Sequence, residues 1–404
     1  MSKIPKLRFK KFSKEWDKKK LGELLEFKNG INGSKEQYGK GIKFINVLDV
    51  LNNDYITYDN IIGKIDIDEQ TLKKNIVEYG DVLFQRSSET REEVGTANVY
   101  LDKGKKATFG GFIIRGKKIG DYNPAFINKL LKTKMARKEI ISRAGGSTRY
   151  NVGQEILKDV ELLFPSDEEQ QKIARFFYLI DKKIEKQQEK VEVLKDYKKG
   201  MMQKIFSQEI RFKGDNGEEY PEWEEKKAEK LFESISDKKH NGELEVLSAT
   251  QDRGVIPRSE LNIDIKYEES SLSSYKRVRK NNFIISLRSF QGGIETSKYD
   301  GLVSPAYTVF NFKENEKQNH DFFSLIFKSR NFINRLNTLI YGIRDGKAIS
   351  FKDFAGVKLQ YPCIEEQEKI ALFFLVIHKK LEKEQEKLDS LNEWKKGLLQ
   401  QMFV

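Results

Sequence analysis

Two stretches of this chain carry the same pattern of apolar and polar positions. Residues 165–206 and 362–403 align without a gap at an offset of 197. In each stretch apolar residues recur at steps of four and three, which is the spacing of a coiled-coil seam. The seam positions of the first stretch are Ile173, Phe177, Ile180, Ile184, Val191, Leu194, Met201 and Ile205. Those of the second stretch are Ile370, Phe374, Ile377, Leu381, Leu388, Leu391, Leu398 and Met402.

The pattern predicts two long helices that pair with each other. A narrow apolar stripe fits one partner helix, and polar interruptions of the stripe can fix the register of the pair. The interruptions are Gln187 and Lys198 in the first stretch, and Glu384 and Lys395 in the second. A helix of about 40 residues spans about 60 Å. We therefore expect the second helix to run back antiparallel along the first, with a globular unit at each end and an approximate two-fold axis.

Each predicted helix follows a globular segment. We expect the globular domains at 1–164 and 208–361, the first helix at 165–207 and the second at 362–404. The two globular domains begin with similar residues: Arg8-Phe9 corresponds to Arg211-Phe212, and Trp16 corresponds to Trp223. The whole chain is therefore an internal duplication.

The globular domains show both strand and helix patterns. Short stretches rich in β-branched and aromatic residues predict strands at 43–51, 81–87, 107–116, 159–165, 245–250, 282–290, 302–312 and 356–362. Helical periodicity predicts helices at 124–144 and 320–340. The predicted fold class is α+β: two mixed α/β domains joined and separated by two long antiparallel coiled-coil helices, with pseudo-two-fold symmetry.

Composition indicates a protein that binds a polyanion. The chain has 404 residues and a net charge of +12, and residues 1–165 alone carry 32 basic and 22 acidic side chains. Two or three domains are expected at this length. A basic excess is most often associated with nucleic acid. No apolar stretch is long enough to span a bilayer and the basic N-terminus has no apolar core behind it, so we expect a cytoplasmic protein.

Residues suited to catalysis are scarce. One cysteine (Cys363) and three scattered histidines exclude a disulfide framework and make a zinc site unexpected. Residues 123–126 (NPAF) resemble an adenine methyltransferase motif but lack its second proline, and a helix start is the favoured interpretation. Residues 342–347 (GIRDGK) fall one residue short of a P-loop. We expect no catalytic or metal site, and no cofactor bound by this chain.

Four loops have the composition of DNA contacts. Residues 145–150 and 341–347 are Gly-rich and basic and precede the last strand of each domain, and 84–91 and 286–293 each follow a strand. Glycines allow close backbone approach, and Arg and Gln side chains read base edges or bind phosphates. Solvated connectors remain the alternative interpretation. The predicted contacts are Gln85, Arg86, Ser87, Arg149, Tyr150, Arg288, Gln291, Arg344 and Lys347.

The start of each long helix resembles a known family. Proline, then Glu-Glu-Gln, then Lys-Ile-Ala occur at 165–174 and again at 362–371. With the duplicated domain-helix plan, the chain resembles the specificity subunit of type I restriction-modification systems. The resemblance implies two target recognition domains, each reading one half of a bipartite DNA sequence, and paired helices that set the spacer between the halves.

The same resemblance implies partners for the chain. The helices would dock two modification subunits, which use S-adenosylmethionine to methylate adenine, and two motor-nuclease subunits that use ATP and Mg²⁺ would complete the complex. Two alternatives stay open at this point. One is a coiled-coil scaffold that organises proteins without reading DNA. The other is a stand-alone nuclease or methyltransferase, which the missing motifs disfavour.

Overall fold

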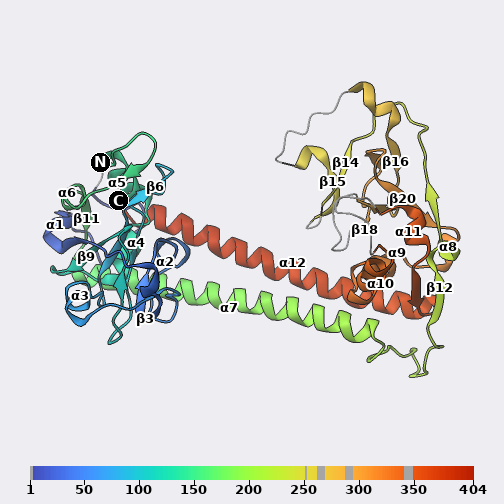
Figure 1. The fold of residues 1–404 in the computed structure, drawn as a ribbon, viewed down its shortest axis with the longest axis horizontal. Coiled ribbons are helices and arrows are strands. Elements are labelled where there is room, and N and C mark those ends of the chain that lie inside the picture. The colour runs from blue at the N-terminus through green and yellow to red at the C-terminus, as the bar shows by residue number, and fades with distance from the viewer. Residues whose placement is uncertain (1–2, 251–252, 262–268, 287–293, 341–348) are drawn as a thin grey trace. The chain divides into compact units, whose positions relative to one another are not determined.

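The structure is a computed structural model that describes residues 3–250, 253–261, 269–286, 294–340 and 349–404. The chain divides into two compact units: residues 1–188 with 386–404 form unit 1, and residues 189–385 form unit 2. Each unit holds one globular part and half of each long helix. These helices are α7 (Asp167–Phe206) and α12 (Ile364–Gln401), and both are continuous (Figure 1).

Unit 1 is built on a four-stranded antiparallel sheet of order β2-β9-β5-β7. Alternate side chains point to opposite faces of a strand, and both faces of this sheet are buried. Val82 and Phe84 of β5 join the core beneath the helices, whereas Leu83 joins a second core with Ile45 and Tyr100. A three-stranded sheet of order β4-β3-β8 adjoins that second core.

The strands of unit 1 are β1 (Asp17–Lys20), β2 (Leu25–Asn29), β3 (Tyr38–Ile45), β4 (Lys64–Ile65), β5 (Val82–Gln85), β6 (Ser87–Ser88), β7 (Ala97–Val99), β8 (Thr108–Phe109), β9 (Ile113–Lys118), β10 (Tyr150–Asn151) and β11 (Glu161–Phe164). Its short helices are α1 (Leu21–Leu24), α2 (Val47–Asn52), α3 (Glu69–Lys74), α4 (Pro124–Leu130), α5 (Lys134–Arg143) and α6 (Gln154–Lys158), with a 3₁₀ turn at Lys35–Gln37.

Unit 2 repeats the central sheet in the order β13-β20-β17-β18, again antiparallel. Its strands are β12 (Glu224–Lys227), β13 (Phe232–Ile235), β14 (Leu247–Thr250), β15 (Gly254–Pro257), β16 (Lys276–Val278), β17 (Phe283–Ile285), β18 (Ile294–Thr296), β19 (Gly301–Val303), β20 (Thr308–Phe312) and β21 (Lys358–Tyr361). Its short helices are α8 (Ala228–Leu231), α9 (His320–Lys328), α10 (Arg330–Ile340) and α11 (Phe351–Ala355), with 3₁₀ turns at Arg258–Glu260, Glu269–Ser274 and Asn315–Lys317.

The two units share a frame and differ around it. The pair β1-β11 corresponds to β12-β21, and α1, α4, α5 and α6 correspond to α8, α9, α10 and α11. Beside the central sheet, however, unit 1 carries β4-β3-β8, whereas unit 2 carries the two-stranded pairs β14-β15 and β16-β19. The duplication thus keeps the frame and changes the surface built on it.

Several element predictions need correction. The strands predicted at 81–87, 107–116 and 302–312 are each two strands, namely β5 and β6, β8 and β9, and β19 and β20. The strand predicted at 43–51 ends at Ile45, and α2 follows, because the Asp49 carboxylate accepts a hydrogen bond from the Asn46 backbone N–H (2.7 Å) and favours a helix start. The helix predicted at 124–144 is two helices, since the Thr133 hydroxyl accepts from the Ala136 N–H and starts α5. The helix predicted at 320–340 is likewise divided, at Ser329.

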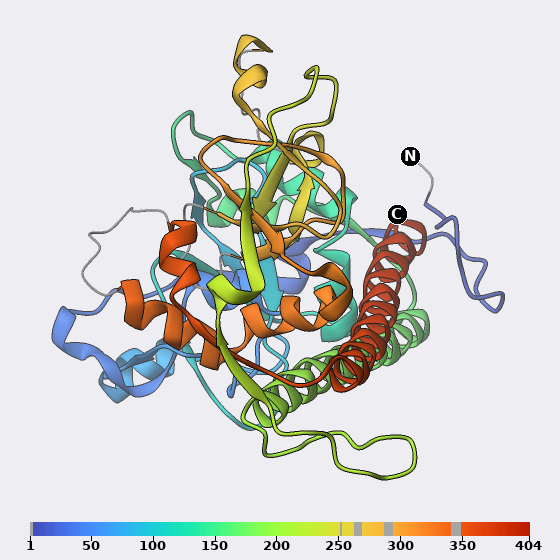
Figure 2. The ribbon, with the colours of Figure 1, turned by 90° about the vertical axis from the view of Figure 1, so that its right-hand side faces the viewer.

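Halves of α7 and α12 pair in antiparallel fashion inside each unit. In unit 1 the start of α7 (Ile173, Phe177) shares a core with the end of α12 (Leu398). In unit 2 the end of α7 (Ile205) shares a core with the start of α12 (Ile370). Within each unit the two helix halves lie side by side in both views, as the seam pattern predicts (Figure 1, Figure 2).

Candidate nucleic-acid interface

The start of α7 is fastened to the globular part of unit 1 by a buried ion pair. Arg8 donates from Nε and Nη2 to the two carboxylate oxygens of Glu169, at 2.8 and 2.7 Å, and Nη2 also donates to the Lys14 carbonyl. The Glu169 side chain is 1% exposed and that of Arg8 is 10% exposed. The bidentate contact with Glu169 raises the pKa of Arg8, so the guanidinium stays protonated.

The glutamine that follows ties the helix to a second element. Gln170 donates to the Pro165 carbonyl (3.0 Å) and accepts from the backbone N–H of Asn123 (2.9 Å), the residue that caps α4. Asn123 therefore has a structural role: its side chain accepts from the Ala125 and Phe126 N–H groups, which confirms the helix start. We call Arg8, Glu169, Gln170 and Asn123 the clamp of unit 1.

Unit 2 reproduces the clamp atom for atom. Arg211 donates to both carboxylate oxygens of Glu366, at 3.3 and 2.7 Å, and Glu366 is fully buried. Gln367 donates to the Pro362 carbonyl (2.9 Å) and accepts from the Asn319 N–H (3.0 Å). The motif that opens each long helix is thus the set of residues that joins the helix to its globular part.

Each long helix also ends inside a globular part. Phe403 contacts Trp16, Phe126 and Phe177 in unit 1, with ring centroids 5.4–6.1 Å apart. Phe206 takes the corresponding place in unit 2 beside Trp223 and Phe322.

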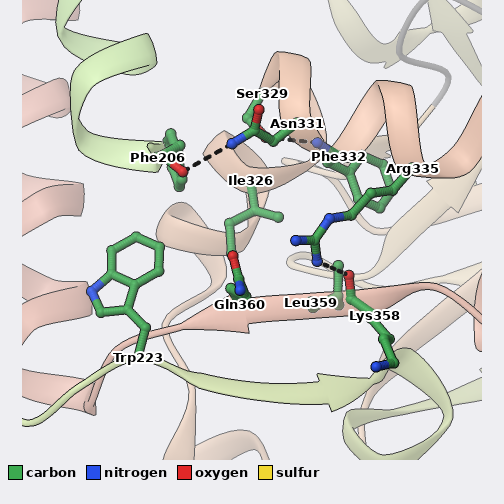
Figure 3. Close-up of a pocket in the computed structure, with 10 residues that line it drawn as sticks. All are labelled: Phe206, Trp223, Ile326, Ser329, Asn331, Phe332, Arg335, Lys358, Leu359 and Gln360. Carbon is green, nitrogen blue, oxygen red and sulfur yellow. Dashed lines mark hydrogen bonds between the residues drawn. The ribbon is translucent and has the colours of Figure 1, made fainter. Parts of the chain in front are cut away.

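A small cavity adjoins the end of α7 in unit 2 (Figure 3). Asn331 donates to the Phe206 carbonyl (3.1 Å), and Arg335 donates to the Lys358 carbonyl (2.8 Å). The cavity volume is about 30 Å³, which is enough to hold a water molecule. This cavity is part of a joint between elements and is too small for a cofactor.

The twelve predicted seam residues nearest the helix centres are all buried or half-buried. Ile173, Phe177, Ile180, Val191, Ile370, Phe374, Ile377 and Leu388 are buried, and Ile184, Leu194, Leu381 and Leu391 are half-buried. One polar interruption is paired inside unit 2, where buried Glu384 accepts from Lys190 (2.8 Å).

The interruption at Lys395 belongs to a charge cluster that only unit 1 contains among the described residues. Lys395 lies 2.8 Å from Asp181 and 3.0 Å from Asp54, and Lys129 lies 2.7 Å from Asp181. Burial would lower the pKa of Lys395, but the two carboxylates outweigh it and raise that pKa. We call Asp54, Lys129, Asp181 and Lys395 the unit 1 charge cluster.

The matching positions of unit 2 are chemically different. An offset of 197 places Lys198 opposite Lys395, and His378 opposite Asp181. Burial lowers the pKa of Lys198, and the charge of Glu382 offsets this only in part. The same seam position therefore carries a well-compensated charge in unit 1 and a poorly compensated one in unit 2.

In unit 1 the structure brings two of the predicted DNA-contacting loops together. Strands β6 and β10 pair antiparallel, with Tyr150 opposite Ser88 and Asn151 opposite Ser87. The Ser87 hydroxyl donates to the Asn151 side chain (2.5 Å). Loops 84–91 and 145–150, which are about 60 residues apart in sequence, thus form one surface.

The predicted contacts in unit 1 differ in how they are placed. The Arg86 side chain is exposed, Ser87 and Tyr150 are half-buried, and Arg149 is 61% exposed with a carboxylate of Glu89 at 3.8 Å. A surface pair at that distance is weak, so the Arg149 guanidinium is free to exchange partners. Gln85 is 4% exposed, and its side chain donates to the Ser87 carbonyl (3.0 Å) within the loop. Arg288, Gln291, Arg344 and Lys347 lie outside the described residues.

Two residues at this surface were missed by the sequence reasoning. Phe112 precedes β9, is 61% exposed, and accepts the Arg86 backbone N–H at its carbonyl (2.9 Å). Arg137 of α5 donates to the Glu92 and Val94 carbonyls and so holds the loop that follows β6. Burial lowers the pKa of Arg137 to about 10. No local sequence signal marks either residue, because both depend on contacts between distant segments.

Within the described ranges, no group of three or more His, Cys, Asp or Glu side chains could hold a metal ion. None of the helices in the described part of the chain is both long enough and apolar enough to cross a membrane.

Comparison with known proteins agrees with this architecture. A family model for the type I restriction modification DNA specificity domain matches residues 13–195 and again residues 221–393. The MjaX specificity subunit of a type I restriction enzyme from Methanocaldococcus jannaschii is 25% identical over 402 residues, which cover 95% of this chain and 92% of that protein. The MjaIX specificity subunit from the same organism is 31% identical over 193 residues, 46% of this chain and 42% of that protein.

Solved structures share the fold. The S subunit of a type I restriction-modification system from M. genitalium superposes with a TM-score of 0.56 at 17% identity, over 99% of both chains. A structure that describes complex assembly and conformational transition of the type I R-M system gives 0.55 at 14% identity, over 96% of this chain and 97% of that one. The family model covers most of the chain in two copies, one for each repeat. The chain therefore belongs to the family of type I restriction-modification DNA specificity subunits.

Proposed function

We propose that each globular part reads one half of a bipartite DNA target and that α7 and α12 set the spacer between the halves. One observation carries this proposal: the clamp is repeated in both units, whereas the surfaces beside the central sheets differ. Two different reading surfaces on one repeated frame suit two different half-sites. We place the recognition domains at 1–164 and 208–361, and the spacer helices at 165–207 and 362–404.

The surface formed by β6 and β10 is the proposed reading site of unit 1. Arg86 immediately precedes β6 and Arg149 immediately precedes β10. Both can bind guanine bidentately or contact phosphates, and Tyr150 and Ser87 can donate hydrogen bonds. The net charge of +10 in residues 1–165 supports this role. Because counterion release scales with the number of phosphate contacts, DNA binding by unit 1 should depend more steeply on salt than binding by unit 2.

A specificity subunit is the non-catalytic component of a type I system. We propose that this chain binds no cofactor, and that its partners supply the chemistry. Two modification subunits would use S-adenosylmethionine to methylate adenine, and two motor-nuclease subunits would use ATP and Mg²⁺. The relatives do not favour a scaffold that ignores DNA sequence.

The outer faces of the long helices support docking of the modification subunits. In unit 1, Leu179 is 57% exposed and Trp394 is 48% exposed, beside the half-buried ring of Phe176. In unit 2 the equivalent positions are Val376 (58% exposed) and Tyr197 (49% exposed). Large apolar side chains on the outer face of a helix pair are typical of a surface that a partner covers. Two equivalent surfaces suit two copies of one partner.

A methylation map tests the proposed function. The chain is produced with its modification subunit, and methylated adenines are mapped across a genome by long-read sequencing. We expect a two-part motif with a fixed gap. Arg86→Ala with Arg149→Ala should relax or abolish one half-site only, and Lys40→Ala with Lys73→Ala, two exposed cations elsewhere in unit 1, serves as the charge control.

A deletion variant tests the role of the helices. Deleting four residues from each long helix should change the gap and leave both half-sites unchanged. A contiguous motif, or a change of half-site on shortening the helices, would contradict the proposal.

A further inference from the structure

The two outer helix faces occupy equivalent positions but have unequal composition. We define patch 1 as Arg175, Phe176, Leu179, Ser390 and Trp394 of unit 1. Patch 2 consists of their equivalents in unit 2, at the offset of 197: Leu372, Phe373, Val376, Val193 and Tyr197.

Helix geometry groups the residues of each patch on one face of each helix. Residues three and four apart share a helix face, which groups Arg175 with Leu179 and Ser390 with Trp394. The rings of Phe176 and Trp394 meet edge to face with centroids 6.4 Å apart, and this contact joins the α7 part of patch 1 to the α12 part. In patch 2 the same spacing groups Leu372 with Val376 on one face of α12, and Val193 with Tyr197 on one face of α7.

Two substitutions make patch 2 the more apolar. Leu372 is 60% exposed where patch 1 has the exposed guanidinium of Arg175, and Val193 is 66% exposed where patch 1 has the exposed hydroxyl of Ser390. Against the same partner surface, leucine and valine gain from burial. Arginine and serine lose hydration unless the partner offers each of them a hydrogen bond.

The other two differences are smaller and favour patch 1. Leu179 exceeds Val376 by one methylene, which is worth roughly fourfold in binding when fully buried. Trp394 and Tyr197 are both large aromatic side chains with a polar edge. The balance leaves patch 2 ahead by about tenfold in affinity, on the order expected for an apolar-to-charged and an apolar-to-polar exchange in one small surface.

We infer that the two modification subunits bind this chain in a fixed order, first at patch 2 and then, more weakly, at patch 1. This inference rests on the proposed function, since it takes the modification subunit as the partner at both patches. One partner with one binding surface cannot be equally complementary to a Leu–Val pair and to an Arg–Ser pair. A complex with a single modification subunit, seated on unit 2, is therefore expected at limiting partner concentration.

Native mass spectrometry of the chain titrated with its modification subunit tests the order. For sites that differ tenfold in affinity, the two stepwise dissociation constants should differ by about twelvefold, against the statistical factor of about four for two identical sites. Leu372→Arg with Val193→Ser should weaken the first step and bring the two constants together. Arg175→Leu with Ser390→Val should tighten the second step, which also makes the two constants more similar.

Controls separate the outcomes. Leu48→Ser removes an apolar side chain that is also 66% exposed but lies on α2, and both steps should stay unchanged. All substituted residues are exposed, so circular dichroism melts should show no loss of folding. A ratio of about four between the two constants of the unmodified chain, as for identical sites, or a tighter first step in the Leu372→Arg variant, would overturn the inference while leaving the proposed function intact. Failure of the unmodified chain to bind any modification subunit would overturn the docking role itself.

Discussion

Glu169→Ala should destabilise unit 1 by about 3 kcal/mol, the lower end of the cost of breaking a buried ion pair. The Glu169 side chain is 1% exposed and makes both hydrogen bonds to Arg8, whose own side chain is 10% exposed. The substitution leaves the Arg8 charge buried with one remaining contact, to the Lys14 carbonyl. The lower end of the range applies because Arg8 lies near the surface and can regain some solvent. Against a typical domain stability of about 5–15 kcal/mol this is a large loss.

A double-mutant cycle, built from the single variants Arg8→Met and Glu169→Leu and their combination, isolates the pair. Replacing both partners by apolar residues, Arg8→Met with Glu169→Leu, should cost about 1 kcal/mol or less, because neither partner is then left buried and unpaired. The resulting coupling free energy of about 2 kcal/mol or more is well above what residues without contact show.

Urea unfolding followed by tryptophan fluorescence provides the assay. Trp16 is buried in unit 1 and serves as its only probe once Trp223 and Trp394 are replaced by Phe. Glu366→Ala, read through Trp223 alone, is the matched substitution in unit 2 and should give a similar loss there. A loss below about 1 kcal/mol for Glu169→Ala, or additive single substitutions, would refute the reasoning that the clamp fastens helix to domain.

Three further predictions concern unit 1. Lys395→Met should cost about 1–3 kcal/mol of unfolding free energy in urea titrations, because Asp54 loses its lysine partner and Asp181 keeps only Lys129. Lys198→Met in unit 2 should be neutral or stabilising, and equal effects would contradict the asymmetry. Phe403→Ala should lower the same free energy by about 3–5 kcal/mol, since a buried ring is lost. A loss below about 1 kcal/mol would argue against a stabilising role for the packing of Phe403 in unit 1. Burial and a neighbouring lysine lower the pKa of Lys132 to about 8, below the ~10.4 of a lysine in an unfolded chain. The unfolded state therefore binds more protons than the folded state between about pH 8 and 10, and the free energy of unfolding should rise across that window. Lys132→Met should remove this part of the slope in stability curves measured from pH 7 to 10.

Sequence reasoning recovered what depends on long repeated patterns. The seam spacing extends over forty residues and occurs twice, so local ambiguity averages out, and both helices are continuous from Asp167 and Ile364. Shorter elements were harder to predict from the sequence. The helix start at Asn46 lies within a run of Val and Leu that also suits a strand, and the hydrogen bond to Asp49 decides between them.

The candidate reading surface shows where single-sequence reasoning ends. It singled out loops 84–91 and 145–150 by composition, but it did not bring them together, because a ladder of two residues at Ser87 and Asn151 leaves no periodic signal. It also named Gln85 as a predicted contact, and strand alternation did not reveal that its side chain is buried and its amide turns back to the Ser87 carbonyl. Phe112 escaped notice because exposure of a single aromatic side chain is a property of the folded surface.

The repeated clamp keeps the attachment of each globular part to its long helix separate from target recognition. Its contacts come from Arg8, Asn123, Glu169 and Gln170, and the hydrogen bonds of the four among themselves and to nearby backbone involve none of the residues of loops 84–91 or 145–150. Mutations that alter what unit 1 recognises can therefore accumulate without weakening the clamp contacts between its globular part and α7. A different globular part that carries the same four residues at the same spacing could make the same contacts with the long helix. New target preferences could therefore arise by exchange of whole globular parts.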